Sequence, residues 1–144
     1  MHANVRAVAR PPFSSDKLYS SPAMTILLWI LQPLLALHTA MGAIWKFSHP
    51  AQTVPSLKAL SPGVWLGMGV TELVCSAALI LALFIKSWGQ LASLGAAVIA
   101  AEMLLFSALY VRSGDRQLGH LIYWLIVAAI CVCIAYGRWT AKPI

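Results

Sequence analysis

The chain has 144 residues, of which 60% are hydrophobic and only 10% are charged, and its formal net charge is +6. Its mean hydropathy is +0.81. Charged residues make up about 25% of an ordinary soluble domain, so this composition excludes that class and indicates a membrane protein. The positive charge does not indicate a nucleic-acid partner, because the basic residues lie at the ends of apolar segments instead of forming one cluster.

Residues 1–22 are predicted to form a disordered basic N-terminal tail. The segment contains Arg6, Arg10 and Lys17 together with prolines and serines. It lacks the apolar core that a cleaved secretory signal needs. A mitochondrial transit peptide is the weaker alternative, because the segment contains Asp16 and adjacent prolines and shows no clear amphipathic period.

Four apolar segments follow, and each has about the 20 residues that an α-helix needs to cross the ~30 Å hydrocarbon core of a bilayer. They are residues 24–45, 63–85, 91–111 and 118–136. Helix breakers and polar residues separate them, at residues 48–62, 86–89 and 112–117. The sequence therefore predicts an all-α fold, namely an integral membrane four-helix antiparallel bundle over residues 23–139, with a short C-terminal tail at residues 140–144.

The distribution of basic residues predicts how the bundle is oriented. Six Lys and Arg residues lie in the N-terminal tail, in the turn at residues 86–89 and near the C-terminus. Four lie at the opposite ends of the segments, and these are Lys46, Lys58, Arg112 and Arg116. Because cytoplasmic loops carry the excess of Lys and Arg, the distribution favours a multi-pass protein with both termini in the cytoplasm.

Three ionisable residues lie inside the apolar segments, and these are His38, Glu72 and Glu102. Their depth follows from the number of residues between each of them and the basic residue or proline at the end of its segment on one membrane face. With ~1.5 Å of rise per residue, the depths are ~12, ~15 and ~15 Å. A charged group at such a depth is costly and usually faces the interior of a bundle. We therefore predict one inward-facing layer in which these three residues are the catalytic groups.

The last apolar segment places aromatic residues at a similar depth. Tyr123 and Trp124 lie ~11–12 Å from the same membrane face, and His120 lies one helical turn nearer that face, on the stripe of Trp124. We predict that these three residues bind a substrate. Three apolar residues are predicted to do the same: Met41, Met68 and Phe106. The remaining tryptophans are predicted to form an interfacial belt: Trp29, Trp45, Trp65, Trp88 and Trp139.

Small residues predict where the helices approach closely. Ala92, Ala96 and Ala100 repeat every four residues in the third segment, and Gly63 and Gly67 have the same spacing in the second.

The cysteines Cys75, Cys131 and Cys133 form neither a CxxC pair nor the spacing of a metal site. Inside apolar helices a thiol acts as a small hydrophobic group. We therefore expect neither a metal site nor thiol chemistry.

Two stretches of the sequence resemble a known family. The run LSPGVWLGMGVTELV at residues 60–74, followed by a helix rich in Ala, Leu and Ile, is similar to the second-helix signature of the DoxX-like four-helix membrane family. The ending IAYGRW at residues 134–139 resembles the family's C-terminal signature. The resemblance covers residues 24–139 and implies a four-helix membrane fold in which the family's second-helix acidic residue is Glu72. Members are associated with quinone-linked sulfur oxidation, oxidative-stress complexes or receptor assembly.

Three classes of function fit these residues. The first is a cofactor-independent acid–base hydrolase, cyclase or isomerase acting on a lipophilic small molecule that enters from the membrane lipids. The second, which the family resemblance implies, is a quinone-binding or redox-complex subunit. The third is an assembly or scaffold protein whose buried polar layer only fixes helix register. We favour the enzyme, and the sequence leaves a homo-oligomer open.

Overall fold

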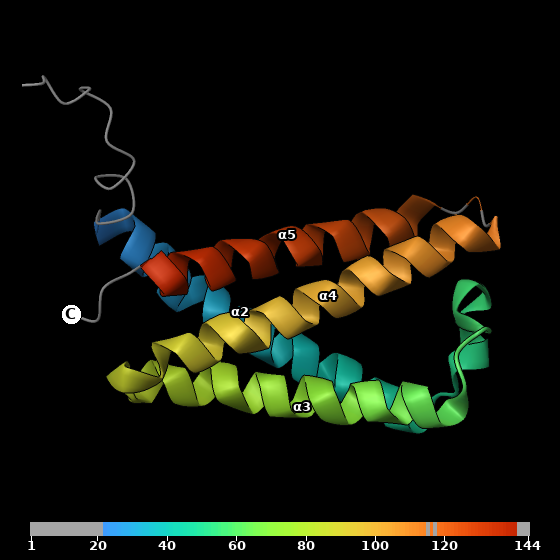
Figure 1. The fold of residues 1–144 in the computed structure, drawn as a ribbon, viewed down its shortest axis with the longest axis horizontal. Helices are drawn as coiled ribbons and strands as arrows, with labels where there is room; N and C mark the ends of the chain where they lie inside the picture. The colour runs from blue at the N-terminus through green and yellow to red at the C-terminus, as the bar shows by residue number, and fades with distance from the viewer. Residues whose placement is uncertain (1–21, 115, 117, 141–144) are drawn as a thin grey trace, which may run out of the picture.

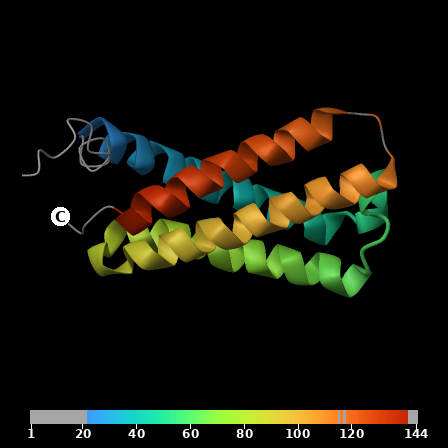
Figure 2. The same cartoon turned by 45° about the horizontal axis from the view of Figure 1, so that its top comes forward.

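A computed structural model describes residues 22–114, 116 and 118–140, and this part of the chain forms four long α-helices and no strand (Figure 1). The α-helices are α2 (Pro22–Ser48), α3 (Pro62–Phe84), α4 (Gly89–Ser113) and α5 (Leu118–Thr140). Short 3-10 helices lie between them: η1 (Ala51–Thr53), η2 (Pro55–Leu57) and η3 (Lys86–Trp88). Successive α-helices run in opposite directions, as the two views in Figures 1 and 2 show. The predicted all-α antiparallel bundle is confirmed.

Each of the four α-helices is long and apolar enough to cross a membrane. All four contain the predicted segments almost completely, and most of them extend by a few residues beyond the predicted bounds. The predicted N-terminal tail lies outside the described residues except for its last residue, Pro22, which begins α2. The predicted C-terminal tail lies outside them after Thr140, which is the last residue of α5.

Local sequence signals account for several helix ends. Ser61 precedes α3, and its side-chain oxygen accepts a hydrogen bond of 3.3 Å from the backbone N–H of Val64. Pro62 then occupies the first turn of α3, where its missing N–H has no intrahelical partner to lose. Gly114 ends α4 with a φ of 70°, a left-handed conformation that glycine adopts without the steric penalty of a Cβ.

The predicted small-residue stripe of α4 lies in the interior of the bundle. Ala92, Ala96 and Ala100 are buried. Between them, a Cβ added at Gly95 would lie 3.3 Å from the backbone oxygen of Cys75 in α3, so only glycine permits this approach without a shift of its neighbour. Gly95, beside this stripe, therefore lets α3 and α4 approach closely.

The glycines that close the interface between α2 and α3 differ from those predicted. Gly63 and Gly67 are exposed and would have no neighbour within 4 Å of an added Cβ. The close approach is made by Gly69, whose added Cβ would lie 3.4 Å from the Phe47 ring and 3.6 Å from the backbone oxygen of Ala43. Gly63 and Gly67 have the spacing of a helix-packing motif, but they lie on a face of α3 that points away from the other helices.

A buried amide joins three helices on the side where α2 begins and α5 ends. The side chain of Gln32 is fully buried, and its Nε2 donates a hydrogen bond of 2.6 Å to the backbone oxygen of Leu79 in α3. Its Oε1 accepts a bond of 2.7 Å from Nε of Arg138 in α5. The Arg138 guanidinium also lies 5.9 Å from the centre of the Trp29 ring. Such interhelical bonds fix the relative positions of apolar helices that have little other means of specifying them.

The segment between α2 and α3, where prolines predicted a break between helices, packs against the bundle. It folds into η1 and η2, and Ala51, Ser56 and Leu57 are buried. The η2 turn packs against α4. Figure 1 shows this segment at the end of the bundle where α4 ends and α5 begins. The segment therefore covers that end of the bundle and contributes to the cavity described next.

Candidate functional site

A cavity of about 400 Å³ lies between the helices and the covering segment. Its rim is formed by exposed residues that carry aromatic or imidazole rings: His38, Trp45, His120 and Tyr123. Its floor is formed by buried residues, including Thr39, Lys46, Trp65, Glu72, Phe106 and Trp124. The size is within the ~300–1,000 Å³ of small-molecule sites, and the mixture of an apolar lining with a few polar groups is typical of them.

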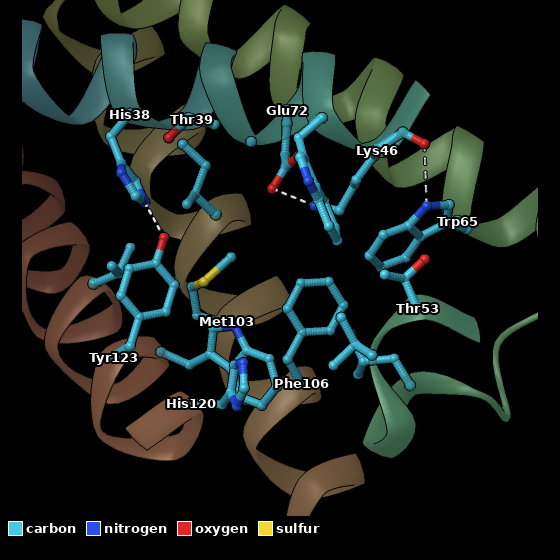
Figure 3. Close-up of a pocket in the computed structure, with 17 residues that line it drawn as sticks. His38, Thr39, Lys46, Thr53, Trp65, Glu72, Met103, Phe106, His120 and Tyr123 are labelled. Atoms are coloured by element: carbon cyan, nitrogen blue, oxygen red, sulfur yellow. Dashed lines mark hydrogen bonds and ion pairs between the residues drawn. The ribbon is translucent and has the colours of Figure 1, made fainter. Parts of the chain in front are cut away.

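The centre of the polar part of the floor is Lys46, only 5% of whose surface is exposed. Its Nζ lies 2.6 Å from Oε1 of Glu72 and 2.9 Å from Oε1 of Glu102, so one ammonium bridges two carboxylates from α3 and α4 (Figure 3 shows the contact with Glu72). The same Nζ lies 5.0 Å from the centre of the Phe106 ring and 5.3 Å from that of Trp65. The ion pairs and the two aromatic rings together compensate the burial of the ammonium.

The prediction that Lys46 marks a water-facing helix end is wrong, and helix geometry explains why. Side chains of an α-helix tilt toward its N-terminus, so a lysine in the last turn of α2 extends back along the bundle. Residues 38, 42 and 46 are four apart and therefore share one helix face. Because that face carries His38 and Gly42 at the cavity, Lys46 is directed to the same place.

The two carboxylates lie in one layer, as predicted, because both contact the same ammonium. Their relation to the cavity differs. Glu72 lines the cavity, whereas Glu102 contacts Lys46 without belonging to the lining. Oε2 of Glu72 is buried and has no hydrogen-bond partner among the described residues.

His38 does not contact the carboxylates. Its Nε2 and the hydroxyl of Tyr123 share a hydrogen bond of 2.5 Å, and the two rings meet edge to face with their centres 5.5 Å apart (Figure 3). Both residues line the cavity but are exposed, so His38 lies at the rim of the cavity and is not buried inside the bundle. The bond joins α2 to α5 at the rim, where the cavity is partly open to the outside.

Aromatic rings form the wall opposite α2. The ring centres of Trp65 and Phe106 are 6.2 Å apart, and those of Phe106 and Trp124 are 5.6 Å apart. His120 extends the row, with its ring centre 5.9 Å from that of Trp124. His120, Tyr123, Trp124 and Phe106 thus line the cavity, as the sequence predicted.

Two tryptophans predicted for the interfacial belt, Trp45 and Trp65, line the cavity, whereas two methionines predicted for the substrate site do not. Trp65 is buried, and its Nε1 donates a 2.8 Å hydrogen bond to the backbone oxygen of His49. Met41 is 63% exposed, because it falls outside the face of α2 that bears His38 and Gly42. Met68 is partly buried against the apolar core but does not line the cavity.

Sequence reasoning missed two groups of lining residues. Lys46 and Thr39 could have been found, because they lie on or next to the helical face that carries His38. A counter-charge for two buried carboxylates is also an expected requirement. By contrast, Thr53, Val54 and Leu57 come from the covering segment, and no periodic pattern in the sequence indicates that it packs against the bundle.

Comparison of the chain with protein-family models, with curated proteins and with solved structures gives no match. The resemblance to the DoxX-like family therefore stays a prediction.

Proposed function

We propose that this chain is a multi-pass membrane protein whose cavity performs acid–base chemistry on a lipophilic small molecule, through epoxide opening or hydrolysis, cyclisation, or double-bond isomerisation. One observation carries the proposal. A buried carboxylate, Glu72, lines a largely apolar cavity with one oxygen bound to Lys46 and the other without a partner among the described residues. A carboxylate held in this way has one oxygen available to take up a proton.

In this proposal Glu72 is the general base. It removes the proton from a water molecule or from a hydroxyl of the substrate, whose oxygen then forms the new bond to carbon. For an epoxide, the ring C–O bond breaks and its oxygen receives a proton from the hydroxyl of Tyr123. His38 shares a hydrogen bond with that hydroxyl and restores its proton. The proton taken up by Glu72 returns through solvent to His38, so one proton is removed from the nucleophile, one is delivered to the ring oxygen, and each protein group regains its starting state.

Glu102 acts through Lys46 in this proposal and is a positioning residue. Two carboxylates and one ammonium carry a net negative charge if all three are ionised. An unbalanced charge is costly in a poorly solvated interior, so we propose that the two carboxyl groups share one proton before substrate binds.

A quinone-binding subunit is the second candidate function. It is favoured by the hydrogen-bonded pair of His38 and Tyr123 at the open rim of an aromatic cavity, because a quinone carbonyl needs such a hydrogen-bond donor next to a flat apolar surface. A purely structural layer is the outcome that remains if neither ligand binds.

The experiment measures conversion of a lipophilic epoxide or polyene by the purified protein, with chelator present and without added quinone or thiol. Glu72→Gln is expected to keep the fold and to lose turnover by roughly 10²- to 10⁴-fold, the loss typical of a missing general base. Cys133→Ala is the control, because this free thiol is exposed and lies outside the cavity. Activity that requires added quinone would favour the second candidate. Full activity of the Glu72→Gln variant would contradict the proposed function.

Mass spectrometry of the lipophilic molecules that co-purify in detergent provides an independent test. A bound quinone would favour the redox subunit, whereas a terpenoid or polyketide would favour the enzyme.

The proposed orientation keeps both termini in the cytoplasm. Because Lys46 lies inside the bundle, the sequence count of Lys and Arg becomes six on the side of the termini against three on the other. Labelling of single cysteines introduced near each terminus, in intact and in permeabilised cells, measures the orientation.

A further inference from the structure

Gly42 in α2 faces Oε2 of Glu72 in α3, and Thr39 lies one helical turn before Gly42 on the same side of α2, so we call these three residues the polar notch. All three residues line the cavity. Thr39 and Glu72 are each only 3% exposed. Oγ1 of Thr39 and Oε2 of Glu72 have no hydrogen-bond partner among the described residues. Two unsatisfied buried oxygens in one wall are unusual, because such groups are normally paired with protein or with a ligand or water.

Gly42 provides the space beside these oxygens. A Cβ added at this glycine would have one neighbour within 4 Å, Oε2 of Glu72 at 4.0 Å. That separation is an ordinary van der Waals contact, so the wall has room for about a methyl group at this point. A group the size of a hydroxyl therefore fits where the side chain of residue 42 is absent.

The hydrogen-bonding capacity of the two oxygens determines which chemical group of a ligand can bind in the notch. The carboxylate oxygen of Glu72 can only accept a hydrogen bond, whereas the Thr39 hydroxyl can donate and accept. A hydroxyl group beside Gly42 can donate to the carboxylate oxygen, and a hydroxyl that also reaches Thr39 can accept from its side chain. An ether or a hydrocarbon can make no bond to the carboxylate oxygen.

We propose that the notch of Thr39, Gly42 and Glu72 binds a hydroxyl group at the polar end of a ligand whose remainder is apolar. This deepens the proposed function and rests on it in one respect, because it takes the ligand of the cavity to be lipophilic. It adds that the hydroxyl proton is directed at Oε2 of Glu72. The substrate hydroxyl is then the group that Glu72 deprotonates, so the reaction is an intramolecular ring closure in which no water is added.

The test compares farnesol, a C15 prenyl alcohol, with farnesyl methyl ether. The two differ in the hydroxyl proton and one methyl group. Binding is followed through the emission of the tryptophans, three of which line the cavity, at a fixed detergent concentration. The wild-type protein is expected to bind the alcohol about tenfold more tightly than the ether, the discrimination that one hydrogen bond to a charged group provides.

Two pairs of variants assign the preference to the notch. Gly42→Ala fills the space, and Thr39→Val removes the hydroxyl at nearly constant shape. Each should reduce the preference for the alcohol at least threefold while leaving the affinity for the ether unchanged. Gly67→Ala and Thr71→Val are the matched controls, because both residues lie on the exposed side of α3 outside the cavity. Both controls should keep the wild-type preference.

Equal affinities for alcohol and ether in the wild type, including the absence of binding by either, would overturn the assignment of the notch. So would a preference that Gly42→Ala leaves intact. The outcome is separable from that of the proposed function. A preference for the alcohol without any turnover would support the notch as a binding site and contradict the proposed enzymatic function. Turnover without a preference for the alcohol would support the enzymatic function and contradict the notch.

Discussion

Replacement of Lys46 by methionine tests the arrangement on which the candidate site depends. The variant keeps a long apolar side chain but removes the ammonium that contacts Glu72 at 2.6 Å and Glu102 at 2.9 Å. All three residues are at most 7% exposed, so the two carboxylates would lose their counter-charge in a poorly solvated place. Loss of one partner of a buried ion pair costs roughly 3–5 kcal/mol. We expect Lys46→Met to lower the free energy of unfolding by an amount in this range.

The combined variant Lys46→Met, Glu72→Met and Glu102→Met separates charge from packing. A buried ion pair replaced completely by well-packed hydrophobic residues of similar volume is often close to neutral in stability. The triple variant should therefore recover most of the stability that Lys46→Met loses. Lys58→Met is the control, because Lys58 is exposed and a surface substitution usually changes stability by no more than about 0.5 kcal/mol.

The assay is denaturant unfolding in detergent micelles, followed by helical circular dichroism. Two results would refute the reasoning. Wild-type stability of Lys46→Met would mean that the ammonium does not compensate the carboxylates. A triple variant no more stable than Lys46→Met would mean that the loss comes from packing of the lysine side chain and not from its charge.

Three more substitutions test the roles assigned above. Tyr123→Phe should keep the fold, because the hydroxyl lies at the exposed rim, and should lower kcat by roughly 10²- to 10⁴-fold in the turnover assay. Glu102→Gln should lower kcat less than Glu72→Gln does and leave KM unchanged, because Glu102 does not line the cavity. Gln32→Leu should lower the free energy of unfolding by about 1–3 kcal/mol, because Nε of Arg138 loses its acceptor; equal unfolding midpoints would contradict this.

Hydropathy and helix rise were sufficient to predict the fold and the carboxylate layer. Apolar segments of membrane length can only be helices, since the backbone must satisfy its own hydrogen bonds in lipid. The rise of ~1.5 Å per residue then converts sequence position into depth, which is why Glu72 and Glu102 could be assigned to one layer. Both steps use only distance along a helix, and neither requires knowledge of its neighbours.

The errors concern direction around a helix and the packing of irregular segments. Met41 and Met68 lie at a suitable depth, but on faces of their helices that do not border the cavity. Because these helices are apolar on all sides, the hydrophobic pattern does not show which face points inward. The contribution of Leu57 depends on how the η1 and η2 segment folds over the end of the bundle. That contact is between residues distant in sequence, and nothing in the local composition specifies it.

The position of Lys46 joins the stability of the bundle to its proposed chemistry. Two carboxylates inside four apolar helices require a cation, and this lysine reaches them because its side chain points back along α2. Its ammonium contacts Oε1 of each carboxylate, so the contact that compensates the charge of Glu72 leaves Oε2 of that residue without a partner at the cavity wall. A layer that served stability alone would be expected to satisfy this oxygen as well, because an unpaired buried acceptor costs about 1–3 kcal/mol. The unsatisfied oxygen is therefore the feature of the layer that packing does not explain and that a ligand hydroxyl would.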